Sequence, residues 1–232
     1  MDRIKFKCFD KKILSKYPIE KVKIIDFNWI KNMMEHLKKH KNWRAHTGRC
    51  PGIISVVRLG WIHKAYQNFT IETNGDMNTF RWETDIDQAK TSYGKIIGDY
   101  VNFHETEQLA DFKLMPLHTL NTLIKINSPW YVNIPKGYRL LCMPVPYPCN
   151  NAFTAAFGIL DQDNVLNVPL YWHVPNGKVL VKKGTPLCQY VLLKDHDCVH
   201  VNEMISKKEI EKVKQSKAHI LNKQDGRKGL NV

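Results

Sequence analysis

The chain has 232 residues, a hydrophobic content of 43% and six tryptophans, which predicts a folded protein with a sizeable core rather than a disordered one. No uninterrupted apolar run approaches the roughly 18 residues that a membrane-spanning helix needs, and the first 21 residues lack the apolar stretch of a signal peptide. We therefore expect no membrane association. The six cysteines are scattered without a C-x-x-C pair, which disfavours a zinc ribbon and is typical of reduced thiols.

The formal net charge of +13 is concentrated at the two ends of the chain. Residues 1–44 carry 13 Lys/Arg against 5 Asp/Glu, residues 207–232 carry 8 against 3, and residues 45–206 carry 14 of each sign. A basic groove inside the central region is therefore not predicted. Two interpretations of the ends stay open, namely solvated lysine-rich helix faces and nonspecific contact with a polyanion.

The N-terminal part predicts one strand and one helix before the central region. Alternating residues from Ile4 indicate a half-exposed strand. A helix is expected over residues 27–42, because four apolar residues recur at helical spacing on one face. These residues are Ile30, Met33, Met34 and Leu37.

Strand signals dominate from residue 53 onward. Residues 53–62 are rich in β-branched side chains and predict a buried strand, and Asn74-Gly75 predicts a hairpin. We expect residues 84–121 to form a long loop with short elements. Beyond residue 123 the predicted strands have the sequences LIKI, WYVNI, YRLLCMPV, FTAAFGIL, VPLYWHV, KVLV and LCQYVLL.

A second hairpin is predicted at Asn176-Gly177, between VPLYWHV and KVLV, and a final helix from Glu203. The fold class is therefore mainly β (α+β), with a barrel or sandwich core over residues 50–193. We expect one domain over residues 1–202, in which residues 1–45 hold the first strand and helix, and a helical, basic tail over residues 203–232.

Residues 130–193 resemble the barrel of the trimeric deoxyuridine triphosphatases (dUTPases). The similarity rests on P-x-G-Y at Pro135–Tyr138, on Gly158-Ile159-Leu160-Asp161, and on the later K-K-G-x-x-x-x-Q stretch, Lys182 to Gln189. The resemblance implies a dUTPase-like barrel and a homotrimer. It also implies that Asp161 orients an attacking water and that Gln189 helps to hold phosphate oxygens, with Asn164 and Lys183 as further ligand-binding candidates.

The sequence departs from that family where the chemistry takes place. Asn164 lies near the position of the family's sugar-stacking tyrosine, and residues 146–150 read PYPCN in place of the phosphate-binding Arg-Ser-Gly turn. The family's glycine-rich arm and magnesium-anchoring motif have no counterpart. Phosphate hydrolysis requires cations that neutralise the developing charge. The residues themselves therefore favour Asp161 as a turn residue that bonds its own backbone over a catalytic carboxylate.

A second resemblance covers about residues 4–193, through RCPG at residues 49–52, Gly60-Trp61, Phe80-x-Trp82, Pro129-Trp130 and the later motifs in the same order. Through these motifs the chain is similar to an uncharacterised family of tailed-phage proteins with more distant bacterial relatives. It implies a viral origin, one continuous domain, and a location in the host cytoplasm or the virion.

A weak metal candidate follows the last predicted strand, where one strand face would present His196, Cys198 and His200. The alternative is a solvated connector. The leading functional hypothesis is a non-enzymatic phage accessory or virion-associated protein that uses its barrel to bind or assemble, with a virion or host protein as partner. The rival is a nucleotide-binding or nucleoside-triphosphate-hydrolysing protein that acts through Asp161 and Gln189. No cofactor is expected, and Mg²⁺ is required only by the rival.

Overall fold

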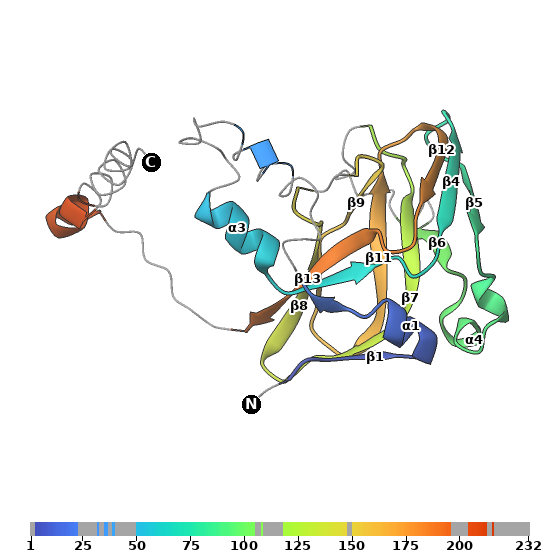
Figure 1. The fold of residues 1–232 in the computed structure, drawn as a ribbon, viewed down its shortest axis with the longest axis horizontal. Coiled ribbons are helices and arrows are strands. Elements are labelled where there is room, and N and C mark those ends of the chain that lie inside the picture. Colours follow the sequence, from blue (N-terminus) through green and yellow to red (C-terminus); the bar gives the residue numbers. More distant parts are fainter. Residues whose placement is uncertain are drawn as a thin grey trace.

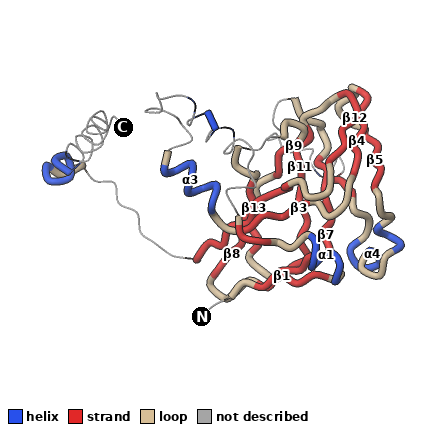
Figure 2. The backbone as a smooth tube through the Cα atoms, in the orientation of Figure 1, coloured by secondary structure: helices blue, strands red, loops and turns tan. Residues whose placement is uncertain are grey.

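The structure, a computed structural model, describes residues 3–22, 32, 35–36, 39, 50–104, 108, 118–147, 150–195, 204–212 and 215. Its strands form three antiparallel sheets with five, five and three strands (Figure 1). Figure 2 shows that the helices near these sheets lie at the periphery of the strands. We call the sheets A, B and C.

Sheet A is built around β7 (Leu123–Asn133), whose eleven residues are almost all buried. One edge of β7 pairs with β11 (Asn164–Trp172), which pairs in turn with β9 (Phe153–Ala155). The other edge pairs at its two ends with two short strands, β1 (Lys5–Cys8) and β6 (Val101–His104). The burial of β7 follows from having partners on both edges and core on its face.

Sheet B has the order β10-β8-β13-β3-β2. Its strands are β10 (Gly158–Leu160), β8 (Tyr138–Met143), β13 (Pro186–Lys194), β3 (Trp61–Lys64) and β2 (Glu20–Lys21). The helix α3 (Pro51–Arg58) covers part of the outer face of this sheet, because Val57 packs with Ile62 and Val145 in a small separate cluster.

Sheet C has the order β12-β4-β5. Its strands are β12 (Asn176–Val181), β4 (Phe69–Asn74) and β5 (Phe80–Thr84). Residues on β4 alternate between buried and less buried, as expected for a sheet with one face toward the core. Three short helices complete the described core region, namely α1 (Lys11–Lys16), the 3₁₀ helix η3 (Gln88–Lys90) and α4 (Gly94–Ile97).

One hydrophobic cluster joins the three sheets and α1. Its fully buried members include Trp172 on β11, Tyr190 on β13 and Phe69 on β4. The described residues are mainly β, which confirms the predicted fold class. The sheets are open paths with ends, so the predicted barrel is not closed within the described residues, and a sandwich is the better description. The specific likeness to the dUTPase barrel stays a prediction.

The prediction of a strand over residues 53–62 is wrong. Residues 51–58 form α3, and only Trp61 and Ile62 of the predicted span belong to a strand. β-branching is a weak signal that packing overrides, and here Ile53, Val56 and Val57 share a helix face that packs on sheet B. Pro51 at the first turn also favours a helix start, because its missing N–H needs no partner there.

The hairpin at Asn74-Gly75 is confirmed, because β4 pairs with β5 across that turn. The hairpin predicted at Asn176-Gly177 is wrong, since β12 pairs with β4 rather than with β11. The Thr73 hydroxyl on β4 donates to the carbonyls of Val174 at 2.8 Å and Gly177 at 3.2 Å. These bonds attach the start of β12 to sheet C.

Two further boundaries differ from expectation. LIKI and WYVNI form the single strand β7, while FTAAFGIL divides into β9 in sheet A and β10 in sheet B. The first strand is confirmed as β1, and residues 85–104, which follow β5, contain only the short elements η3, α4 and β6, as expected. The helix predicted over residues 27–42 lies outside the described residues except at four isolated positions, and the C-terminal helix is confirmed over residues 207–212.

Candidate functional site

The four residues predicted to bind or act on a ligand lie in different environments. Asp161 follows β10 and is exposed, and its carboxylate has no hydrogen bond or ion pair within the described part of the chain. Asn164 begins β11, is exposed, and accepts the Val165 N–H at 2.8 Å through its side-chain oxygen. Gln189 is fully buried on β13. Lys183 is exposed and lines a cavity beside α1.

The strand register separates Asp161 from Gln189. Leu160, the residue before Asp161, lies opposite Leu140 of β8, whereas Gln189 lies opposite Met143 of the same strand. Three residues of strand correspond to about 10 Å. The structure therefore does not bring the carboxylate and the amide to one point.

The candidate metal ligands His196, Cys198 and His200 lie outside the described residues. Within the described ranges, no group of three or more His, Cys, Asp or Glu side chains is placed to hold a metal ion.

A cleft of about 300 Å³ opens between α1 and the turn that carries Lys183. We call it the α1 cleft. Asp10 determines the start of α1, because its carboxylate accepts the N–H groups of Lys12 at 2.7 Å and Ile13 at 3.0 Å. With the helix started there, Lys12 and Lys16 are one turn apart and both line the cleft, while Ile13 is buried beneath them.

Backbone hydrogen bonds hold the opposite wall in place. The side-chain oxygen of Asn68 accepts the Lys183 N–H at 2.8 Å. The next residue, Gly184, has a φ of +85° and donates its N–H to the Ala65 carbonyl at 2.7 Å. Gln67, which is buried, accepts the Ile86 N–H at 2.8 Å. The backbone at Lys183 is therefore fixed, although its ammonium group reaches solvent.

The α1 cleft combines positive charge with apolar walls. Lys12, Lys16 and Lys183 contribute three ammonium groups, against one carboxylate from Asp85. Its remaining lining is mostly apolar or aromatic, and comprises Ile13, Tyr17, Tyr66, Gln67 and Ile86. Burial raises the pKa of the Tyr66 phenol, whose hydroxyl donates to the side-chain oxygen of Gln88. Tyr66 is therefore neutral, and the lysines dominate the charge of the cleft.

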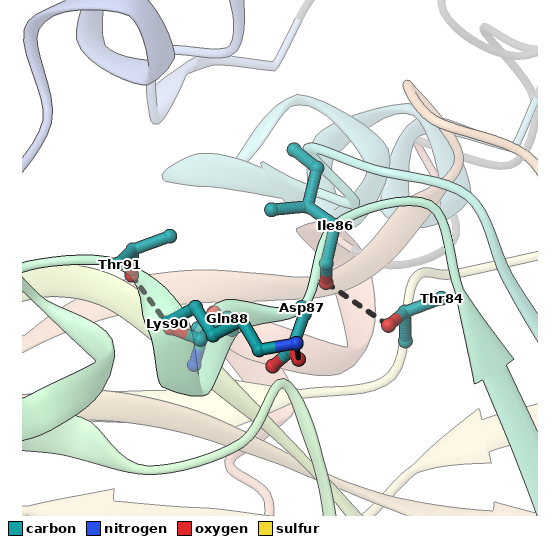
Figure 3. A network of polar contacts seen from close by, with 6 residues as sticks. All are labelled: Thr84, Ile86, Asp87, Gln88, Lys90 and Thr91. Carbon is teal, nitrogen blue, oxygen red and sulfur yellow. Dashed lines mark hydrogen bonds and ion pairs between the residues drawn. The ribbon is translucent and has the colours of Figure 1, made fainter.

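The segment from Thr84 to Thr91, drawn in Figure 3, contributes residues to two cavities: Asp85 and Ile86 line the α1 cleft, and Thr84, Asp87 and Gln88 line a second cavity. Short local hydrogen bonds hold it. The Thr84 hydroxyl donates to the Ile86 carbonyl at 3.0 Å, and the Thr91 hydroxyl donates to the Gln88 carbonyl at 2.6 Å. In Figure 3 the Ile86 side chain and the Asp87 carboxylate point to opposite sides of the segment.

A buried polar cluster in the core has the residue types of an enzyme site but no access. His63 forms hydrogen bonds with the Ser128 hydroxyl at 3.1 Å and with the Tyr190 hydroxyl at 3.3 Å. The three residues are at most 2% exposed. Burial lowers the pKa of His63 to about 4, so the ring is neutral at pH 7. This cluster stabilises the core rather than meeting a substrate.

Of the site residues predicted from the sequence, only Lys183 lines the α1 cleft, and the other residues of the cleft were not predicted. Tyr17, Tyr66 and Gln67 precede Lys183 by more than 100 residues, and only the pairing of sheets brings them together. One local signal was available: Asp10 followed by lysines at positions 12 and 16 indicates a capped helix with two cations on one face.

No described helix has the length and apolar character to cross a membrane. Comparison of the sequence with models of known protein families and with curated proteins finds no match.

Proposed function

We propose that this chain is a non-enzymatic binding protein whose α1 cleft takes a small organic anion with a flat apolar body, of which nucleotides are the first class to test. The single observation that carries the proposal is the placement of Lys12, Lys16 and Lys183 around a mostly apolar cleft of about 300 Å³. That volume is at the lower end of the range for small-molecule sites.

The chemistry of the lining matches the two parts of such a ligand. The ammonium groups supply charge-assisted hydrogen bonds to a phosphate, carboxylate or sulfate. Tyr17 is half-buried and, with Ile86, offers apolar surface to a ring. The lysines are exposed, so we expect them to contribute modest affinity that weakens as salt increases.

Binding without turnover is proposed because the rival mechanism needs Asp161 and Gln189 at one site. The side-chain amide of Gln189 is buried and donates to two backbone carbonyls of the α3 end, at 2.9 and 2.5 Å, and Asp161 is exposed elsewhere. The resemblance to tailed-phage proteins supports an accessory or virion-associated role, in the host cytoplasm or the virion, with a virion or host protein as partner. Assembly as a homotrimer and polyanion contact through the lysine-rich ends belong to the same proposal.

The test is calorimetric titration of the full chain with deoxynucleoside mono- and triphosphates and with inorganic phosphate, with and without Mg²⁺. We expect saturable nucleotide binding whose affinity falls severalfold in Lys16→Gln and in Lys183→Gln. Lys182→Gln is the matched control, because Lys182 is an exposed neighbour that does not line the cleft. Phosphate alone binding as tightly as nucleotide would assign the cleft to simple anions.

Equal losses of affinity in Lys182→Gln and Lys183→Gln would show that only net charge matters, and would overturn the proposal. Absence of binding for every compound tested would overturn it as well. The rival is tested in the same samples by chromatography of the products. Nucleotide hydrolysis that disappears in Asp161→Asn would establish an enzyme instead.

A further inference from the structure

A second cavity, of about 310 Å³, is lined in part by Thr84, Asp87 and Gln88 of the Thr84–Thr91 segment. We call it the seam cavity, because it opens where sheets A and C meet without pairing. Trp82 and Thr84 of β5 form one side, and Val101 of β6 forms part of the other. β5 is an outer strand of sheet C, and β6 pairs only with β7 in sheet A.

An aromatic cluster holds Trp82 at the rim of the seam cavity. The indole ring of Trp82 lies 5.5 Å from the ring of Phe80 and 6.3 Å from that of Phe103, between centroids. Phe80 and Phe103 meet edge to face at 5.8 Å. Trp82 is nevertheless 39% exposed. Its orientation is therefore determined by two neighbouring rings while part of its surface stays open to a ligand.

Two carboxylates line the same cavity, those of Asp87 and Asp99, and the described residues that line it include no cationic side chain. The backbone that carries Asp99 is fixed on both sides. Gln88 donates its side-chain amide to the Gly98 carbonyl at 2.7 Å, and Asn127 donates its own to the Asp99 carbonyl at 2.8 Å. Gln88 and Asn127 are both buried. The backbone that carries Asp99 is therefore held in place before any ligand arrives.

Lys90 is a competitor for the Asp87 carboxylate. Its ammonium nitrogen lies 2.9 Å from an Asp87 oxygen, but the two side chains are 83% and 51% exposed. Ion pairs with that exposure are weak and exchange readily with solvent. An incoming cation can therefore replace Lys90 at Asp87.

We propose that the seam cavity binds an organic cation, an alkylammonium or guanidinium group, between the Trp82 ring and the carboxylates of Asp87 and Asp99. The ring attracts a cation through its negative face, and the carboxylates accept charge-assisted hydrogen bonds from its N–H groups. The chain as a whole carries +13, so its overall charge repels cations and saturable binding requires a local site. This site is separate from the α1 cleft and does not depend on the function proposed for that cleft.

The experiment is an NMR or calorimetric titration of the full chain with agmatine, which carries a guanidinium and an ammonium group, at 150 mM salt. Tetramethylammonium is a second probe that tests the ring alone, since it has no N–H group. We expect one saturable agmatine site whose affinity falls at least tenfold in Asp99→Asn. The same fall is expected in Trp82→Leu, and Trp82→Phe should retain part of the affinity.

Two matched variants decide the outcome. Asp161→Asn removes the same charge from an exposed position that does not line the cavity, and it should leave agmatine binding unchanged. Lys90→Gln should tighten binding severalfold, because the internal competitor is gone. Similar losses in Asp99→Asn and Asp161→Asn, or weaker binding in Lys90→Gln, would overturn the proposal. Circular dichroism identifies any variant that fails to fold, and the exposed position of Asp99 keeps its variant informative if Trp82→Leu does not fold.

Discussion

The side-chain amide of Gln189 on β13 closes the C-terminal end of α3, because it donates to the carbonyl of Leu59 at 2.5 Å and to that of Val56 at 2.9 Å. The last carbonyls of a helix have no partner within the helix. Gln189 supplies a donor to the Leu59 carbonyl and a second donor, beside the Leu59 N–H, to the Val56 carbonyl. It so fastens α3 to sheet B at the point where the chain turns into β3. Its side-chain oxygen is buried without a hydrogen bond in the described structure.

We expect Gln189→Leu to lower the free energy of unfolding by about 1–2 kcal/mol, because the Leu59 carbonyl loses its donor and the Val56 carbonyl keeps only the Leu59 N–H at 3.3 Å, while one unpaired oxygen is removed. Gln189→Glu should be more destabilising, since it places a buried carboxylate against carbonyl oxygens. Urea unfolding measures both. Gln162→Leu is the control, an exposed glutamine between β10 and β11, and should change stability little. Wild-type stability in Gln189→Leu would contradict this role.

The environment of Gln189 could be predicted from the sequence only in part. The strand pattern of residues 186–194 is unambiguous, and β13 was predicted correctly. Whether a polar residue on a strand faces a ligand or a helix depends on what covers that face. That covering element, α3, was predicted as a strand because Ile53, Ile54, Val56 and Val57 are β-branched. One error in secondary structure therefore hid the environment of a candidate site residue.

The pairing of strands far apart in the sequence also limited what could be predicted of the α1 cleft. Asn74-Gly75 and Asn176-Gly177 are both strong local hairpin signals, but only the first closes a hairpin. In the structure the two signals are neighbours, because Asn176 lies opposite Asn74. The strand content and mainly β class follow from local patterns. The partners of β12, and with them the position of Lys183 beside α1, depend on contacts about 100 residues apart.

Asp10 is predicted to support the α1 cleft indirectly, through the helix that carries Lys12 and Lys16. Asp10→Ala removes the acceptor of two N–H groups, and we expect it to cost about 1 kcal/mol of stability and to weaken anion binding in the cleft. Asp10→Asn should preserve both, because asparagine caps helices equally well. Ser15→Ala, at an exposed position of the same helix, controls for a change in helix composition. Equal anion affinity in Asp10→Ala and wild type would contradict the positioning role.

Gly94 is predicted to be essential for the close contact between α4 and η3, the helix that carries Gln88 of the seam cavity. A Cβ atom added there would lie 1.6 Å from the carbonyl oxygen of Gln88, so α4 and η3 would have to separate. We expect Gly94→Ala to lower the thermal midpoint by several degrees and to weaken ligand binding in the seam cavity. Gly158→Ala is the matched control, since a Cβ atom at Gly158 would meet no atom within 4 Å. Equal midpoints in the two variants would contradict the tight contact.

The pH dependence of stability should report the buried His63. Burial lowers its pKa to about 4 from 6.5, so the unfolded chain binds the proton more readily than the folded chain does. The stabilising contribution is therefore fully present above pH 6.5 and is lost progressively as the pH falls toward 4, by a total of about 3 kcal/mol. The pKa of His173 is also lowered by burial and acts in the same direction, so only a comparison between variants isolates His63.

Urea unfolding at pH 7.5, 6.5, 5.5 and 4.5 measures that comparison. His63→Gln should be less stable than wild type at pH 7.5, because it disturbs the hydrogen bonds to Ser128 and Tyr190, but its stability should fall less steeply below pH 6.5. The difference between the two chains should therefore narrow as the pH falls. Parallel curves for wild type and His63→Gln would show that His63 is protonated without cost, and would remove the basis for a neutral ring in the core.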